Sequence, residues 1–214
     1  MPNLIYLADP MCSWCYGFGP ELLALLDGLP GLHVEIVVGG LRAYNTEVMD
    51  DAMKAELMQH WKKVHDISGL TFRDTALEQP GFIYNTEPAC RAVVAARTLA
   101  PAAALPVFHA IQHAFYSEGR DVTRADVLAE VCCAALEADG TPTTHEAFLA
   151  VWSSEKIVLA THGDFVQTKN WKIDGFPALV LERNGQLDMV TSGYTRVAAL
   201  VEQMQTLVDN SAQS

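Results

Sequence analysis

Two cysteines separated by two residues, Cys12 and Cys15, lie between a strand-like segment and a helix-like segment. Residues 3–8 (NLIYLA) have the length and the continuous apolar character of a buried central strand. Residues 13–29 follow as a helix with leucines on one face, and residues 33–38 (HVEIVV) form a second buried strand. A strand, a cysteine turn, a helix and a second strand in this order predict a βαβ unit, whose two strands are normally parallel.

The charge and the cysteine count restrict the classes of protein to which this chain can belong. Its 14 basic and 26 acidic residues give a net charge of −12, and half of its 214 residues are hydrophobic. A chain this acidic is a poor partner for nucleic acids or anionic membranes. Five cysteines are few, and odd in number, for a disulfide-stapled secreted scaffold. The first residues carry no basic segment, and no apolar run approaches the ~20 residues of a membrane span. We therefore expect a soluble, cytoplasmic protein with reduced thiols.

The middle of the chain, residues 42–171, has the apolar spacing and the start signals of several helices. These helices are expected to start after Asn45-Thr46, at 85–88, at Leu105, after a Thr123 cap, at a capping box of Thr143 and Glu146, and near Ser154. No internal repeat or low-complexity linker interrupts the segment. It is predicted to form a helical block.

The end of the chain returns to strands. Residues 177–182 (PALVLE) and 187–191 are predicted to pair as a hairpin around the Asn184-Gly185 turn, and Thr195 is expected to cap a last amphipathic helix. The strands at the two ends of the chain therefore belong to one small sheet. This gives two predicted domains.

The predicted α/β domain combines residues 1–41 and 172–214, and residues 42–171 form a helical insertion domain.

The position of the cysteine pair favours redox chemistry. A helix N-terminus presents unpaired N–H groups and the positive end of the helix dipole, which would stabilise a thiolate at Cys12. Cys15 lies one helical turn further on, where it can attack a mixed disulfide formed on Cys12. Ser13 can donate a further hydrogen bond to the thiolate, and Trp14 offers an apolar surface to a substrate.

Two other interpretations of the cysteines compete with this one. A structural zinc site needs four ligands, but the vicinal Cys132-Cys133 has the wrong spacing for a second ligand pair. His109 and His113 share a helix face without an evident carboxylate partner. The remaining interpretation is a pair of inert buried thiols. We expect no metal, and we expect Cys90, Cys132 and Cys133 to be small core residues.

A second motif, Gly175-Phe176-Pro177, comes directly before the predicted hairpin. In the simpler interpretation Pro177 only starts a strand, a position at which proline is tolerated. In the sharper one the Phe176–Pro177 peptide is cis and packs against the cysteine turn. The backbone of Phe176 would then be free to pair with an extended substrate.

The order of these motifs along the chain resembles the thioredoxin-like superfamily, and the large helical insertion resembles its DsbA-like family. Residues 9–17 (DPMCSWCYG) look like the cytoplasmic FrnE-type branch, as does Asn85-Thr86 with the small and basic residues after it. Pro20 matches the kinking proline of thioredoxin-type helices. The resemblance implies a thioredoxin-like β-α-β…β-β-α fold of the α/β class with a large all-helical insertion.

The resemblance also implies roles for particular residues. Cys12 would be the attacking thiolate, Cys15 the resolving thiol and Pro177 the cis-proline, while Phe176 would offer its backbone to the substrate.

The chain departs from the family pattern at three places. Tyr6 stands where thioredoxins carry a buried acid, and Asp9 is interpreted equally well as a turn residue before a proline. The dipeptide between the cysteines is Ser13-Trp14, and Phe176 is bulkier than the residue usual before this proline. These departures leave the redox potential open, and with it the direction of electron flow.

The leading functional hypothesis is a thiol–disulfide oxidoreductase that acts on protein or small-molecule disulfides. It would need no cofactor beyond its own redox-active disulfide, with glutathione or another thiol as the electron donor, and it would act as a monomer or homodimer. One alternative is a glutathione-dependent enzyme like the 2-hydroxychromene-carboxylate isomerases or kappa-class transferases, which typically lack the second cysteine. The other is a non-catalytic DsbA-like binding adaptor, which makes no demand on Cys15.

Overall fold

The computed structural model describes residues 3–212, with side chains in the last helix described as far as Met204. Its four strands are β1 (Asn3–Ala8), β2 (His33–Val38), β3 (Ala178–Arg183) and β4 (Gln186–Ser192). They form one mixed sheet in the order β2-β1-β3-β4. β1 pairs in parallel with β2 and antiparallel with β3, and β3 pairs antiparallel with β4. The predicted parallel βαβ unit and the C-terminal hairpin are therefore both confirmed.

The hairpin turn follows from its two residues. Asn184 and Gly185 have positive φ angles of 52° and 79°. A two-residue turn with both central residues in this region matches the right-handed twist of the strands that it joins. Asparagine and glycine adopt this conformation at the lowest cost, which is why the sequence pattern located the turn correctly.

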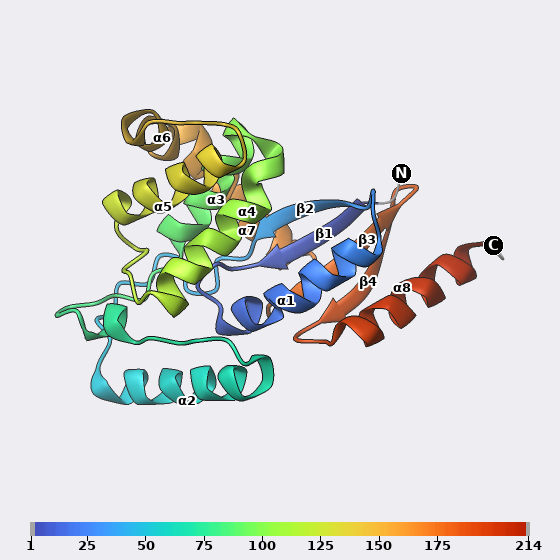
Figure 1. Cartoon of the computed structure of the whole chain (residues 1–214), viewed down its shortest axis with the longest axis horizontal. Helices are drawn as coiled ribbons and strands as arrows, with labels where there is room; N and C mark the ends of the chain where they lie inside the picture. The colour runs from blue at the N-terminus through green and yellow to red at the C-terminus, as the bar shows by residue number, and fades with distance from the viewer. Residues whose placement is uncertain (1–2, 213–214) are drawn as a thin grey trace.

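Helices make up most of the rest of the described chain (Figure 1). The α-helices are α1 (Ser13–Gly28), α2 (Asp51–Ser68), α3 (Glu87–Leu99), α4 (Ala104–Gln112), α5 (Ala125–Ala138), α6 (His145–Trp152), α7 (Glu155–Asn170) and α8 (Val197–Ala212). Two short 3₁₀ segments occur at Thr75–Glu78 and Pro101–Ala103, and α4 continues into a π-helical turn at His113–Ser117. Among the described residues, no helix combines the length and apolar character that a membrane span requires.

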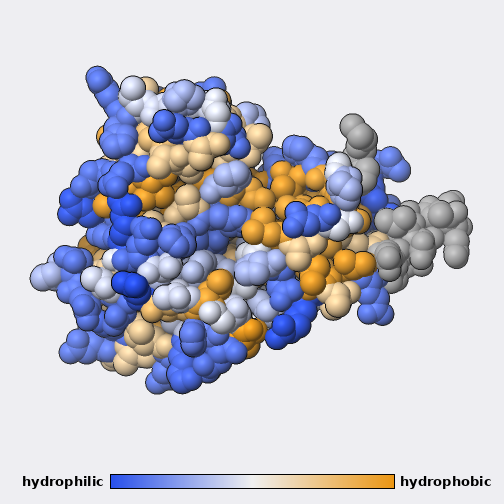
Figure 2. Space-filling model, in the orientation of Figure 1, coloured by the Kyte–Doolittle hydropathy of each residue, from blue (hydrophilic) through white to orange (hydrophobic). Residues whose placement is uncertain are grey.

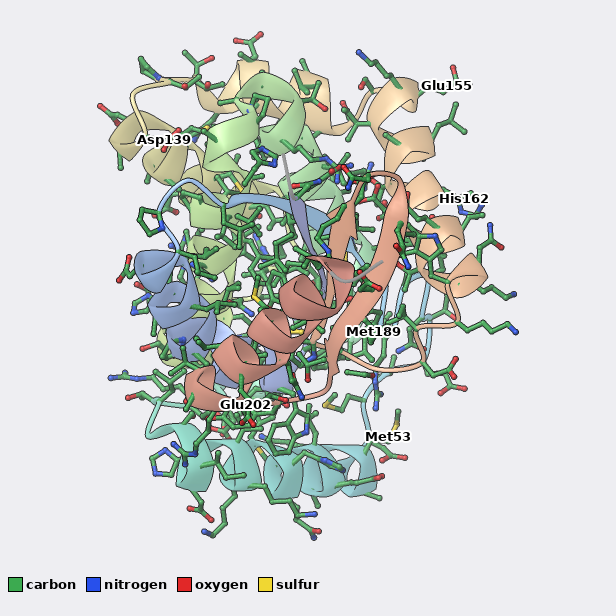
Figure 3. All side chains as sticks on the ribbon, turned by 90° about the vertical axis from the view of Figure 1, so that its right-hand side faces the viewer. Met53, Asp139, Glu155, His162, Met189 and Glu202 are labelled. Carbon is green, nitrogen blue, oxygen red and sulfur yellow. The ribbon has the colours of Figure 1, made fainter. Side chains whose placement is uncertain are left out.

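The helices form layers around the sheet. Figure 1 shows α1 and α8 side by side on one face, and the helices α3 to α7 as a block beside β2. In Figure 2 hydrophilic residues cover most of the outline of this view, and hydrophobic residues reach the surface mainly towards its middle. The side chains of Glu155 and His162 on α7 point outward (Figure 3), and both residues are exposed.

The main hydrophobic core joins the sheet to the helical block. One continuous cluster of buried side chains contains residues of β1, α1, α4 and the π-helical turn. Tyr6 of β1 meets Phe108 of α4 edge to face, with ring centroids 5.7 Å apart. A smaller cluster on the other face of the sheet includes Ile5, Leu7 and Ile173. The division into an α/β domain of residues 1–41 and 172–214 and an insertion domain of residues 42–171 is not tested by these clusters and stays a prediction.

Four helix starts differ from their predicted caps. The cap of α2 is Asp50, whose carboxylate accepts the Met53 N–H at 2.7 Å, so this helix does not begin directly after Asn45-Thr46. α5 begins at Ala125, because the Thr123 hydroxyl donates to Asp121 instead of capping.

α6 is capped by Thr144, so the predicted capping box of Thr143 and Glu146 is wrong by one residue. At α8 the Val197 N–H donates to Glu21 at 2.7 Å, and the Thr195 hydroxyl faces Thr191 instead.

Candidate active site

The first cysteine lies at the junction between β1 and α1. Cys12 is the N-cap residue of α1: its N–H donates to the Asp9 carbonyl, and its carbonyl accepts the Tyr16 N–H, both at 3.0 Å. The Cys12 side chain is 5% exposed. Its thiol lies 3.7 Å from the Phe176 carbonyl, to which it donates. The structure therefore brings together the two sequence motifs, which are 164 residues apart.

The second cysteine is sealed inside the protein. Cys15 has no exposed surface. Burial raises the pKa of its thiol well above the ordinary value, and the hydrogen bond to Cys12 and the charge of that residue raise it further. Both cysteines are free thiols in this structure. Of the two cysteines, only Cys12 has any exposed surface.

Tyr6, at the position where the family resemblance leads one to expect a buried acid, faces the second cysteine. It is fully buried in β1, and the pKa of its phenol is raised well above the ordinary value by burial first and then by the two cysteines. The group facing Cys15 is therefore a neutral phenol at pH 7, and it does not supply a negative charge to the site.

The second motif, Gly175-Phe176-Pro177, adopts the predicted cis form rather than only starting a strand. The Phe176–Pro177 peptide is cis, and the Pro177 carbonyl accepts the Gly193 N–H at 2.7 Å. The aromatic ring of Phe176 packs directly over Gly39, where an added Cβ would lie 2.0 Å from a ring carbon. Gly39 is needed because no side chain fits beneath this ring.

Ser13 and Trp14, predicted to contact substrate, differ in accessibility. Ser13 is buried in the first turn of α1 with 9% of its surface exposed. Trp14 is half-buried, and its ring lies 6.0 Å from that of Tyr194. Of the two, Trp14 is therefore the more exposed, and its contact with substrate stays a prediction.

Asp9 has a role that the sequence left undecided. It is fully buried, and its carboxylate accepts the N–H groups of Met11 at 2.8 Å and Leu41 at 2.7 Å. The Cys90 thiol also donates to it, at 3.4 Å. Burial raises the pKa of Asp9, and these N–H bonds oppose the rise. Asp9 therefore acts as a turn residue that joins the cysteine turn to the loop after β2, and Cys90 is a partner of that carboxylate as well as a core residue.

Two tyrosines of the helical block reach the cysteine turn, and the sequence analysis missed both. The Tyr84 hydroxyl donates to the Met11 carbonyl and lies 3.4 Å from the Tyr116 hydroxyl. Tyr116 belongs to the π-helical turn, and its ring stacks on Tyr16 at 4.8 Å. Burial is the main cause that raises the pKa of both phenols. A π-helical turn often marks a functional site, but no short sequence motif encodes one.

The side chains considered for a zinc site do not gather. His109 is half-buried and lies against Gly19, whereas Nδ1 of the exposed His113 lies 3.3 Å from a Glu118 carboxylate oxygen. Cys132 and Cys133 lie in the middle of α5, as expected. Among the side chains that the structure describes, no group of three His, Cys, Asp or Glu residues is arranged as metal ligands.

Comparisons with known proteins agree with this geometry. A protein from Nitrosomonas europaea, provisionally assigned as a protein disulfide isomerase, is 35% identical over 98% of both chains, with a TM-score of 0.87. The cytosolic disulfide reductase DsbM from Pseudomonas aeruginosa is 26% identical over 99% of this chain and 100% of its own, with a TM-score of 0.77. DsbM has also been solved with GSH, at a TM-score of 0.76. No curated protein sequence matched the chain.

The family model gives the broader assignment. The model of the DSBA-like thioredoxin domain matches residues 4–205, which is nearly the whole chain. A 2-hydroxychromene-2-carboxylate isomerase shares only the fold, with 16% identity over 99% of this chain and 98% of its own and a TM-score of 0.66. By its cysteine turn, its helical insertion and this match, the chain belongs to the family of DSBA-like thioredoxin domains.

Proposed function

We propose that this protein is a thiol–disulfide oxidoreductase that exchanges disulfides through Cys12 and Cys15. The observation that carries the proposal is that the slightly exposed Cys12 lies in front of the fully buried Cys15. Cys12, at the N-terminus of α1, is 5% exposed and lies 3.7 Å from the Phe176 carbonyl, while Cys15 behind it has no exposed surface. This arrangement allows one cysteine to meet the substrate and the other to release it.

The exchange would proceed in two steps. The Cys12 thiolate attacks one sulfur of the substrate disulfide, and the other substrate sulfur leaves as a thiolate. Cys15 then loses its proton and attacks the Cys12 sulfur, which releases the second substrate thiol and leaves a Cys12–Cys15 disulfide. The Phe176 backbone before Pro177 would pair with an extended substrate, and Ser13 and Trp14 would line the approach to Cys12.

Two glutathione molecules would return the enzyme to its dithiol form and leave as oxidised glutathione. DsbM, described as a cytosolic disulfide reductase and solved with GSH, supports a reductive direction and glutathione as donor. We accordingly propose a cytoplasmic reductase for protein or small-molecule disulfides that needs no other cofactor. We propose that it works as a monomer or homodimer.

Insulin reduction with glutathione or dithiothreitol as donor tests the proposal. We expect wild type to accelerate the reduction, Cys12→Ala to abolish the acceleration, and Cys15→Ala to accumulate mixed disulfides that mass spectrometry detects. Cys133→Ala, a cysteine change in α5, is the matched control and should keep wild-type activity.

The alternatives make different predictions for the same variants. Isomerase activity with bound glutathione that survives in both Cys12→Ala and Cys15→Ala would favour the 2-hydroxychromene-carboxylate isomerase type. If the wild-type protein neither reduces insulin nor reacts preferentially at Cys12, the redox proposal is wrong and the non-catalytic binding adaptor remains.

A further inference from the structure

The loop after β2 brings one arginine next to the cysteine turn. The Leu41 N–H donates to the Asp9 carboxylate at 2.7 Å, and the Asp9 carbonyl accepts the Cys12 N–H at 3.0 Å. A single residue, Asp9, therefore ties Cys12 to the residue that directly precedes Arg42.

Arg42 is held firmly at this position. Its N–H donates to the Thr86 hydroxyl at 3.2 Å, and its carbonyl accepts the Thr86 N–H at 3.4 Å. Its guanidinium lies over the ring of Tyr84, 5.4 Å from the centroid. The hydroxyl of the same tyrosine donates to the Met11 carbonyl. The positive charge is thus separated from the residue before Cys12 by one aromatic ring.

This charge has no carboxylate partner in the described part of the chain. Six of the eight arginines form ion pairs, namely Arg91, Arg97, Arg120, Arg124, Arg183 and Arg196. Arg42 and Arg73 form none with the side chains described up to Met204. Arg42 is also exposed. The Arg42 guanidinium, over the ring whose hydroxyl contacts the cysteine turn, is therefore a local positive charge in a chain of net charge −12.

An exposed guanidinium without an ion-pair partner is suited to binding a carboxylate. It offers several N–H donors in a planar fork that matches the two oxygens, and a ring face beneath it keeps its orientation. The negative charge of the whole protein repels anions, so an anionic substrate needs a local cation near the reacting sulfur. In a cysteine-containing peptide such as glutathione, the carboxylates belong to the two residues that flank the cysteine.

We propose that Arg42 binds a carboxylate of the thiol that reduces the Cys12–Cys15 disulfide, and so selects acidic peptide thiols of the glutathione type. The inference rests on the proposed oxidoreductase function and adds the specificity of its electron donor. In the step concerned, a glutathione thiolate attacks Cys12 and Cys15 leaves as a thiolate. A second glutathione then attacks the mixed disulfide, which yields the dithiol enzyme and oxidised glutathione.

Reduction kinetics of the oxidised protein with two thiols test this assignment. Glutathione carries carboxylates and 2-mercaptoethanol carries none, so the ratio of their second-order rate constants isolates carboxylate recognition. We expect Arg42→Met to lower this ratio on the order of 10-fold, and Arg42→Lys, which keeps the charge, to lower it less. Arg73→Met, which removes the other arginine without an ion pair, should leave the ratio unchanged.

The possible results separate this proposal from the one on which it rests. If Arg42→Met slows both thiols equally, Arg42 acts only by packing on Tyr84, and the proposal is overturned. An unchanged ratio also overturns it, because the carboxylate is then bound elsewhere or not at all. If the oxidised wild-type protein reacts with neither thiol, the oxidoreductase function itself fails. A ratio that falls only for Arg42→Met and Arg42→Lys supports the assignment.

Discussion

At the scale of single residues, the Asp9 carboxylate explains how the cysteine turn keeps its shape. Its two oxygens accept the N–H groups of Met11 and Leu41, and the Cys90 thiol also donates to it. Its hydrogen-bonding capacity is therefore used by the loops themselves. Asp9 thus holds Cys12 and the loop after β2 in register.

Gly39 lies directly beneath the ring of Phe176. A Cβ added there would lie 2.0 Å from the Phe176 ring, so Gly39→Ala must displace this ring and the carbonyl that faces Cys12. We expect a loss of stability of about 1–3 kcal/mol, as for other overpacked sites. We also expect slower insulin reduction. Thermal unfolding and the reduction assay would measure the two effects.

Gly163→Ala in α7 is the matched control, because an added Cβ there meets nothing within 4 Å. Alanine in a helix interior should raise stability by about 1 kcal/mol and leave the activity unchanged. Equal behaviour of the two variants would contradict the role given to Gly39.

The lowered pKa of His109 predicts that the stability of the folded protein depends on pH. Burial lowers the pKa of its imidazole from 6.5 to about 4. Between these two values the unfolded chain binds a proton that the folded protein does not, so stability falls as the pH is lowered from 6.5 to 4. The loss is about 3 kcal/mol at most, at ~1.4 kcal/mol per pKa unit.

Urea unfolding of wild type and His109→Leu at several pH values between 4 and 7 isolates this contribution. The difference in unfolding free energy between the two proteins should shift in favour of the variant as the pH falls. A pH-independent difference for His109→Leu would count against the buried, neutral imidazole.

At the scale of elements, two side chains cover the outer edge of β2. Arg97 of α3 donates to the Ile36 carbonyl at 2.6 Å, and Asp164 of α7 accepts the Val38 N–H at 3.0 Å. The two side chains also form an ion pair at 3.0 Å, with only 23% and 11% of their side-chain surfaces exposed. They complete the hydrogen bonding of an edge strand and fix two helices to it.

Asp164→Ala should therefore be strongly destabilising, because it leaves the Arg97 charge and the Val38 N–H without their partner. We expect a loss of about 3–5 kcal/mol in urea unfolding. Asp66→Ala breaks the exposed pair with Lys62 and should cost less than about 0.5 kcal/mol. Similar losses for the two variants would show that the cover on β2 contributes little.

The elements also show where sequence patterns succeed. All four strands and the turn at Asn184-Gly185 were predicted from local patterns, because apolar runs and turn residues act over a few neighbours. The predicted helix caps were wrong where a second polar residue offers a competing hydrogen bond. Thr123 bonds to Asp121 next to it, and the cap of α8 comes from Glu21, 176 residues before the N–H that it accepts.

At the scale of the whole molecule, the sheet and the helical block share one core. Tyr6 of β1 packs on Phe108 of α4, and both belong to the same continuous cluster. We expect the two parts to unfold together, so the most protected amides of β1 and α4 should exchange with the same opening free energy. Native-state hydrogen exchange read by mass spectrometry measures this. Exchange from α4 at a distinctly lower free energy would instead indicate two separately folding domains.

The candidate site shows the same limit of sequence reasoning on a larger scale. The cysteine turn and Pro177 were found because each carries a local motif. Tyr84, Tyr116 and Arg42 were missed, because only the packing of the helical block brings them to the turn. A single sequence contains no short pattern that records such contacts.

The topology of the sheet sets the order in which the site forms during synthesis. β1 needs β3 at its second edge, with Leu4 opposite Leu181, and Cys12 needs the Phe176 carbonyl. A ribosome adding 5–20 residues per second takes roughly 10–30 s to make the chain between them. During that interval the nascent chain carries an unshielded Cys12 beside an open strand edge, exposed to the same thiols and disulfides that the finished protein would handle. Protection of this thiol before Pro177 emerges must come from outside the sheet.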